Sequence, residues 1–189
     1  MASEWTDAIA RARENAPFLA RSLDRLPDLA DLLVQGDLDA AFDYAAKAGE
    51  GAETGVALRR KRLALALTLA IGDLSGVLTL DDVMRRLSSF ADIALDRAIA
   101  EAARTRTTLE SVDGFFALAL GKHGACELNY SSDIDPILLF DPDVLASGAR
   151  SGPAETAQRM ARDILRLLAD HTEEGYVFRV DLRLRPAAE

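Results

Sequence analysis

The stretch that decides the fold is Gly121-Lys-His-Gly-Ala-Cys-Glu-Leu-Asn-Tyr-Ser-Ser-Asp-Ile-Asp135. It follows a short apolar run, 115–120, which the glycines on either side mark as a buried strand. Gly121 and Gly124 come directly after this strand. Glycines in such a place let backbone N–H groups approach phosphate oxygens closely. The pattern therefore predicts a strand that leads into a glycine-rich turn.

The same stretch ends in a pair of aspartates, Asp133 and Asp135, at the start of a second apolar run. Side chains alternate along a strand, so the two carboxylates project to one face and Ile134 projects to the other. Paired carboxylates suit a hard divalent cation such as Mg²⁺, which takes oxygen ligands. The pair therefore predicts a metal site on one face of a sheet.

A further strand pattern covers 176–185, with apolar side chains on one face and charged side chains on the other. Asp181 lies between arginines on the charged face, and burial of such charges is unfavourable unless they are paired or ligated. If this strand neighbours that of Asp133, Asp181 becomes the third carboxylate of a metal site. Arg179 and Arg183 are then available to bind phosphate or acidic partners.

Each of these features also has a simpler explanation. Asp-x-Asp pairs are common in loops, and a strand with alternating Arg and Asp can be a solvated edge strand. Lys122 does not complete a P-loop, because the spacing and the following residue are wrong. His123 and His171 lack partners at metal-ligand spacing and are predicted to be non-catalytic, and Cys126 is predicted to be packed in the interior.

The order of elements predicts an α+β fold. Residues 1–108 are predicted to be helical, and Thr79 with Asp82 forms a capping-box pattern at the start of one helix. From 109 onward strands enter the pattern. The predicted elements are helices at about 38–48, 56–71 and 154–171, and strands at 115–120, 134–140 and 176–185.

Composition restricts the function classes. The net charge is −9, from 31 acidic and 22 basic residues, which argues against binding nucleic acid through a broad basic surface. The single cysteine excludes an intrachain disulfide and suits a reducing compartment. The N-terminus lacks the pattern of a secretion signal, and the run from Leu63 to Ile71 is about half of what a bilayer requires. We therefore expect a soluble, cytoplasmic protein.

The glycine–aspartate stretch and the Arg-Val-Asp-Leu-Arg-Leu-Arg-Pro stretch, 179–186, together resemble the signature of glutamine synthetase adenylyltransferases. The first belongs more generally to DNA polymerase β-like nucleotidyltransferases, and the second narrows the resemblance to this family. Residues 72–76 and 87–92 are also similar to the family's helical region. The resemblance implies a helical N-terminal region, 1–108, followed by a truncated nucleotidyltransferase core, 109–189, with a mixed β-sheet and flanking helices.

Members of this family are bifunctional, and the early motif resembles the half that removes AMP from glutamine synthetase. That half uses phosphate to cleave the AMP–tyrosine bond, which gives ADP. The resemblance implies Mg²⁺ as cofactor and ATP or ADP and phosphate as ligands. It implies glutamine synthetase as partner, and the PII regulatory protein as a further partner of the full-length enzyme. We expect neither nucleic acid nor a membrane as a partner. By the same resemblance Asp133, Asp135 and Asp181 are catalytic and hold Mg²⁺, while Gly121, Gly124 and Ser132 shape the phosphate-binding loop.

The sequence departs from the family pattern at Pro136, where a leucine usually follows the second aspartate. Proline removes a backbone N–H from a strand. The sequence also ends soon after Pro186, without the second catalytic half. Two alternatives therefore stay open beside an active enzyme: a catalytically incomplete fragment that only binds glutamine synthetase, and another small nucleotidyltransferase that modifies a protein.

Overall fold

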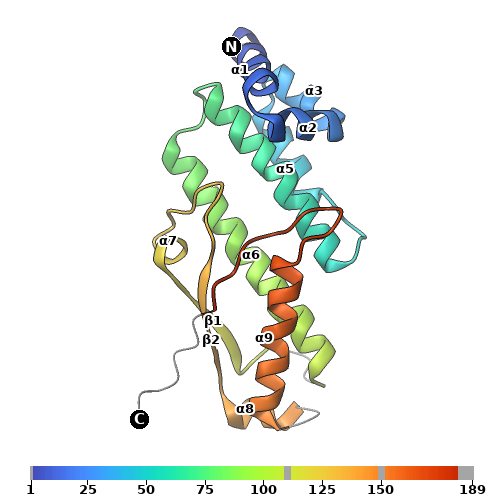
Figure 1. The fold of residues 1–189 in the computed structure, drawn as a ribbon, viewed down its shortest axis with the longest axis vertical. Helices are drawn as coiled ribbons and strands as arrows, with labels where there is room; N and C mark the ends of the chain where they lie inside the picture. Colours follow the sequence, from blue (N-terminus) through green and yellow to red (C-terminus); the bar gives the residue numbers. More distant parts are fainter. Residues whose placement is uncertain (1, 109–111, 149–151, 183–189) are drawn as a thin grey trace. The chain divides into compact units, whose positions relative to one another are not determined.

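The computed structural model describes residues 2–108, 112–148 and 152–182 (Figure 1). Its elements form two compact units, Met1–Arg86 and Leu87–Glu189. In chain order the elements are α1 (Ala2–Asn15), α2 (Pro17–Arg25), α3 (Pro27–Gln35), α4 (Leu38–Lys47), α5 (Thr54–Leu74), α6 (Leu80–Arg106), β1 (Phe115–Leu120), α7 (Gly121–Gly124), β2 (Asp135–Phe140), α8 (Pro142–Gly148) and α9 (Pro153–Ala169).

The first unit is helical, as predicted. Pro17 and Pro27 open α2 and α3, where a missing backbone N–H removes no helical hydrogen bond. Gly36 ends α3 in the left-handed conformation (φ 75°), and a Cβ there would lie 3.0 Å from Nε1 of Trp5. The buried side chains that form the core of this unit are Trp5, Ala8, Ile9, Ala12, Leu23, Leu29, Leu33, Ala41, Ala45, Ala64, Leu67 and Ile71.

The helix predicted over 56–71 is confirmed as α5, whose residues from Ala66 to Gly72 are all buried. The turn after α5 closes tightly, because the side chain of Leu78 lies 2.6 Å from where a Cβ on Gly72 would stand. The predicted capping box at the start of α6 is also confirmed. The Thr79 hydroxyl accepts a hydrogen bond from the Asp82 N–H (3.2 Å), and the Asp82 carboxylate accepts one from the Thr79 N–H (3.0 Å).

The second unit contains a two-stranded antiparallel sheet in which Phe115 pairs with Phe140 and Leu120 pairs with Asp135. Helix α9 presents one buried face to this unit, made by Thr156, Ala157, Met160, Ile164 and Leu168 at helical spacing. The chain then folds back on the end of α9, because the N–H groups of Val177 and Phe178 both donate to the carbonyl of Leu168. Phe178 packs against Phe90 of α6, with ring centroids 5.8 Å apart.

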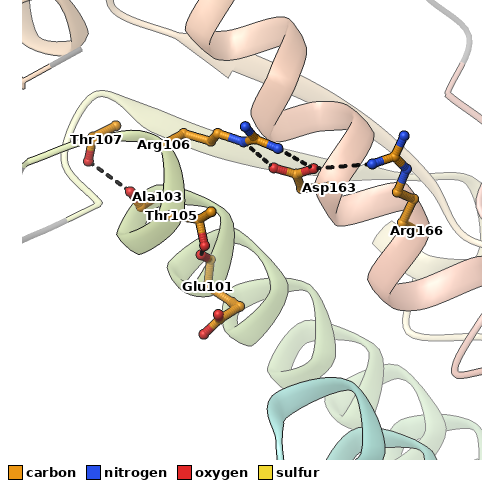
Figure 2. A network of polar contacts seen from close by, with 7 residues as sticks. All are labelled: Glu101, Ala103, Thr105, Arg106, Thr107, Asp163 and Arg166. Atoms are coloured by element: carbon orange, nitrogen blue, oxygen red, sulfur yellow. Dashed lines mark hydrogen bonds and ion pairs between the residues drawn. The ribbon is translucent and has the colours of Figure 1, made fainter. Parts of the chain in front are cut away.

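An ion pair joins the C-terminal end of α6 to α9 (Figure 2). The Arg106 guanidinium donates two hydrogen bonds to the Asp163 carboxylate, at 2.5 and 3.0 Å, and both side chains are partly buried. These hydrogen bonds and the charge of Asp163 raise the pKa of Arg106. Arg166 approaches the same carboxylate to 3.9 Å. Bidentate pairs of this kind fix geometry as well as charge, so α9 is held in register with α6.

The strand predicted over 176–185 is not found in the part of it that the structure describes, 176–182. Val180 makes only an isolated parallel bridge to Ile134. Ile134 donates its N–H to the Arg179 carbonyl and accepts from the Asp181 N–H, both at 3.0 Å. Backbone groups of alternate residues point the same way, so the next donor on this side of β2 would be residue 136.

Residue 136 is a proline and has no N–H, so the ladder stops after one bridge. The proline is tolerated because its nitrogen faces the 179–182 segment, which leaves Asp135 and Ile137 to bond with β1. The fold is therefore α+β, as predicted, with an antiparallel pair of strands and one parallel bridge.

The compact units divide inside α6, whereas the sequence predicts that the catalytic part begins at residue 109. Compactness does not test where a catalytic part begins, so that boundary stays a prediction. Within the described ranges, none of the helices combines the length and the apolar character that spanning a membrane demands.

The capping box of α6 gives a pH-dependent prediction. The hydrogen bond from the Thr79 hydroxyl, and then that from its backbone N–H, lowers the pKa of Asp82 below the usual 3.8. A carboxylate whose folded-state pKa is lowered stabilises the fold above the ordinary pKa, and this stabilisation is lost as the pH falls through the folded-state pKa. We expect Asp82→Asn to lower the thermal midpoint at pH 7 by roughly 2 °C and to make progressively less difference below about pH 4.

Circular-dichroism melts of wild type and Asp82→Asn at pH 7, 4 and 3 measure this difference. Thr79→Ser, which keeps the hydroxyl, serves as the control and should melt close to wild type. A gap between wild type and Asp82→Asn that stays constant across this range would contradict the role of the carboxylate.

Candidate functional site

The glycine-rich turn lies directly at the end of β1 and contains α7. Gly121 adopts a positive φ of 57°, which favours glycine. A Cβ on Gly121 would stand 3.3 Å from Oδ2 of Asp135, so the turn and that carboxylate are in contact. A Cβ on Gly124 would lie only 2.5 Å from the carbonyl oxygen of Ala119. Both predicted glycines are thus required by the local backbone.

A second turn precedes the aspartates and is held by its own side chains. The Asn129 side-chain oxygen accepts from the Ser131 N–H, and the Ser132 hydroxyl accepts from the Asn129 N–H, both at 3.0 Å. Arg179 donates to the carbonyl of Ser131. The predicted phosphate-binding residues Ser132 and Arg179 therefore brace the backbone that leads into Asp133.

The bridge between Ile134 and Val180 sets the positions of the predicted carboxylates. Because these two residues are paired in register, Asp135 is opposite Asp181 on the neighbouring segment. Neighbouring strands lie about 4.8 Å apart, and side chains at alternate positions share a face. Asp133, Asp135 and Asp181 therefore belong to the face opposite the fully buried Ile134.

The three carboxylates are not gathered around one point. Asp133 is exposed and Asp135 and Asp181 are partly buried. Among residues 2–108, 112–148 and 152–182, no group of three or more His, Cys, Asp or Glu side chains is arranged to hold a metal ion. The backbone thus brings the three positions together, while the side chains do not form a closed ligand set. Arg183 lies outside the described residues.

The same face of the sheet carries large exposed apolar side chains. Phe116 and Leu118 of β1 are 53% and 52% exposed, so the prediction that this strand is buried is wrong for this face. Ala117, which lies between them, is partly buried. They pair with Leu139 and Ile137 of β2, which are also exposed. Leu120 pairs with Asp135, so this apolar face continues directly into the carboxylates.

The structure corrects the prediction for Cys126, which is exposed and not packed. Its φ of 59° places it in the left-handed region, at the end of the glycine-rich turn.

His171 follows α9 and packs against the ring of Tyr176, with centroids 4.7 Å apart. His123 is buried, and its Nε2 lies 2.8 Å from Oδ1 of Asp92.

Sequence reasoning missed the contacts of His123 and of Asn129. His123 is an unpaired histidine in the sequence, and its partner Asp92 is 31 residues away on another helix. Asn129 had a local signal, because an asparagine two residues before another polar residue often forms a side-chain turn.

The carboxylate oxygens of the predicted site suit a hard divalent cation by their chemistry.

A strand, a glycine-rich turn and a second strand that begins at Asp135, with Asp133 two residues earlier, indicate a nucleotidyltransferase-type domain. Comparison with known proteins is consistent with this class. The family model described as glutamate-ammonia ligase adenylyltransferase matches residues 7–189. The chain belongs to this family. Glutamate-ammonia ligase is glutamine synthetase.

Several curated relatives share one name, bifunctional glutamine synthetase adenylyltransferase/adenylyl-removing enzyme. The relative from Bradyrhizobium sp. (strain ORS 278) is 38% identical over 212 residues, which cover 98% of this chain and 21% of the relative. That from Mesorhizobium japonicum is 34% identical over 95% of this chain and 20% of the relative. That from Caulobacter vibrioides is 44% identical over 68% of this chain and 14% of the relative. The chain thus spans about a fifth or less of the length of these relatives.

The close approach at Gly124 gives a stability prediction. Gly124→Ala places a methyl group against the Ala119 carbonyl, where neither backbone can move freely. We expect a loss of about 1–3 kcal/mol in the free energy of unfolding, measured by urea denaturation. Gly152→Ala is the control, because a Cβ there meets nothing within 4 Å. Gly152 is the N-cap of α9, so this variant loses only the N-cap preference for glycine and should be clearly more stable than Gly124→Ala. Equal stability of the two variants would contradict the crowding at Gly124.

The missing N–H of Pro136 gives a second prediction. Pro136→Ala restores a donor on the side that faces 179–182, so we expect the amide of residue 136 to be protected from hydrogen exchange. Pro142→Ala is the matched control, because Pro142 opens α8, where an N–H has no helical acceptor. Exchange at residue 136 as fast as that at residue 142 would contradict the explanation for the single bridge.

Proposed function

We propose that this chain is a nucleotidyltransferase domain that acts on glutamine synthetase, in the direction that removes AMP. Its membership of the glutamate-ammonia ligase adenylyltransferase family and the names of its relatives support this proposal. Because the chain spans a fifth or less of those relatives, the proposal concerns one domain's activity. The adenylyl-removing direction is supported by the resemblance of the helical front, which precedes the glycine–aspartate motif, to that half of the family.

The observation that carries the proposal is the register around Ile134. It makes Asp135 and Asp181 neighbours and keeps Asp133 on the same face. The glycine-rich turn contacts this face through Gly121, which lies against the Asp135 carboxylate. Phosphate-binding backbone and metal-binding carboxylates would thus act from adjoining positions.

The charges of the candidate site support the use of a divalent cation. Three carboxylates on one face repel a phosphate, and the net charge of −9 adds to that repulsion. Asp133, Asp135 and Asp181 would hold Mg²⁺, which when bound neutralises phosphate charge and orients the phosphate groups for in-line displacement. Oxygen ligands are those that Mg²⁺ prefers.

The proposed reaction is a phosphorolysis. An oxygen of inorganic phosphate attacks the phosphorus of the adenylyl group on a tyrosine of glutamine synthetase. The bond from phosphorus to the tyrosine oxygen breaks, so that ADP and a free tyrosine hydroxyl are formed, and the proton on the phosphate passes to the tyrosine oxygen. The glycine-rich turn would bind phosphate oxygens through backbone N–H groups, and Arg179, together with Arg183, would offset the charge of the attacking phosphate.

One alternative is a domain that binds glutamine synthetase without catalysis. The observation that favours it is the open arrangement of the carboxylates in the described residues. Under this alternative Asp133, Asp135 and Asp181 do not act on substrate, and their substitution leaves binding to glutamine synthetase unchanged. Measurements of turnover and of binding on the same variants therefore separate the two functions.

The decisive experiment measures ADP released from adenylylated glutamine synthetase in the presence of phosphate and Mg²⁺. We expect release by wild type, and a decrease of at least about a hundredfold in Asp133→Asn, because removal of a metal ligand removes charge stabilisation from the transition state. Asp96→Asn changes an exposed aspartate of α6 in the same way and serves as the control. It should retain wild-type activity.

Binding to adenylylated glutamine synthetase, measured by calorimetry, completes the test. Turnover that disappears in Asp133→Asn but not in Asp96→Asn supports the enzymatic function. Binding without turnover by wild type, while a full-length relative is active under the same conditions, would replace it with the binding function.

A further inference from the structure

Two polar side chains of α6 contact the segment that contains the glycine-rich turn. The hydroxyl of Ser88 accepts a hydrogen bond from the backbone N–H of Leu128, at 3.3 Å. The carboxylate oxygen Oδ1 of Asp92 lies 2.8 Å from Nε2 of His123. Ser88 and Asp92 are four residues apart on one helix, so they belong to the same helical face. One face of α6 therefore contacts both ends of the segment 123–128.

The two contacts lie in different surroundings. Ser88 is 1% exposed, and the side chain of His123 is also 1% exposed. The side chain of Asp92 is 64% exposed. Substitution of Asp92 therefore removes the contact with His123 without opening a cavity in the interior, which makes it a suitable position for a test.

The geometry also defines which ring nitrogen of His123 faces Asp92. A carboxylate only accepts hydrogen bonds, so Nε2 of His123 carries the proton that faces Asp92. Nδ1 is buried and has no hydrogen-bond partner among the described residues. Nε2 is therefore the ring nitrogen that donates to Asp92, and this hydrogen bond ties the buried ring to α6.

The turn has hydrogen bonds of its own, which give it shape. Glu127 donates its N–H to the Lys122 carbonyl at 2.8 Å, and Cys126 donates to the His123 carbonyl at 3.0 Å. These bonds lie within the turn and do not fix its place relative to other elements. The contacts from Ser88 and Asp92 connect it to a long helix.

We propose that Ser88 and Asp92 are positioning residues, which hold the glycine-rich turn against α6 and so keep its backbone beside the Asp135 carboxylate. Gly121 connects the turn to that carboxylate, so movement of the turn would change the separation between the predicted phosphate site and the predicted metal site. The effect on catalysis rests on the proposed function. The attachment of the turn to α6 does not.

Native-state hydrogen exchange on the full chain tests the attachment without any ligand. We expect Asp92→Ala to speed exchange of the Cys126, Glu127 and Leu128 amides by about three- to tenfold, as expected for the loss of one hydrogen bond that opposes local opening. Asp92→Asn keeps an acceptor oxygen at the same place and should restore most of the protection. Asp96→Ala, an exposed aspartate one turn further along α6, is the matched control and should exchange like wild type.

Ser88→Ala provides an independent arm of the same experiment. It removes the hydroxyl that accepts from the Leu128 N–H, so exchange should rise most at Leu128, while amides in α9 such as that of Ile164 stay unchanged. If neither Asp92→Ala nor Ser88→Ala differs from Asp96→Ala at these amides, the proposal is overturned.

Histidine NMR gives a spectroscopic test. The chain has two histidines, so His171→Gln assigns the ring signals of His123 in protein labelled with ¹⁵N-histidine. We expect a proton on Nε2, and a changed Nε2 signal in Asp92→Ala but not in Asp96→Ala. A ring with its proton on Nδ1, or a signal that does not respond to Asp92→Ala, would overturn the proposal.

Turnover separates this proposal from the proposed function. If wild type releases ADP, Asp92→Ala should lower kcat/KM for phosphate by about three- to tenfold, and Asp92→Asn should restore it. Unchanged turnover in Asp92→Ala would overturn the positioning role. If wild type releases no ADP while the exchange and NMR changes are observed, the proposed function fails and the attachment of the turn by Ser88 and Asp92 is supported.

Discussion

The backbone exchange between Ile134 and the segment 179–181 is the constraint on which the candidate site depends. Ile134 gives its N–H to Arg179 and takes that of Asp181, and its side chain is fully buried. With this residue fixed on both its backbone and its side chain, the aspartates on either side of it must face the other way. The same exchange brings in Asp181, which lies 47 residues after Ile134 in the chain. Two hydrogen bonds thus determine which carboxylates share a face.

Helix α6 organises the rest of the second unit around this constraint. Near Ser88 and Asp92 it contacts the segment of the glycine-rich turn, and at Arg106 it is joined to α9 by a bidentate ion pair (Figure 2). A long helix is stiff over this distance, so it carries both contacts in a fixed relation. The end of α9 in turn receives the N–H groups of Val177 and Phe178, which lead into the segment beside Ile134.

The sequence was sufficient wherever a local pattern determined the structure. The apolar run 115–120 and the glycines that follow predicted β1 and the turn, and the Thr79–Asp82 pair predicted the start of α6. The alternation around Ile134 predicted a shared carboxylate face. The prediction of a strand over 176–185 was wrong within the described part, because Pro136 has no N–H to donate to that segment. The proline is visible in the sequence, but the side of β2 that it faces depends on tertiary pairing. His123 and Asp92 could not be matched for the same reason, since their contact joins separate elements.

The crowding at Gly124 restricts which substitutions this protein can tolerate during evolution. The carbonyl oxygen of Ala119 lies 2.5 Å from where a β-carbon at residue 124 would stand, and every other encoded amino acid has a β-carbon. A missense change in this codon therefore meets the same obstacle whichever residue it introduces, polar or apolar, small or large. Substitutions at residue 124 are therefore selected against. The neighbouring exposed residues, such as Lys122 and Cys126, do not have this particular restriction.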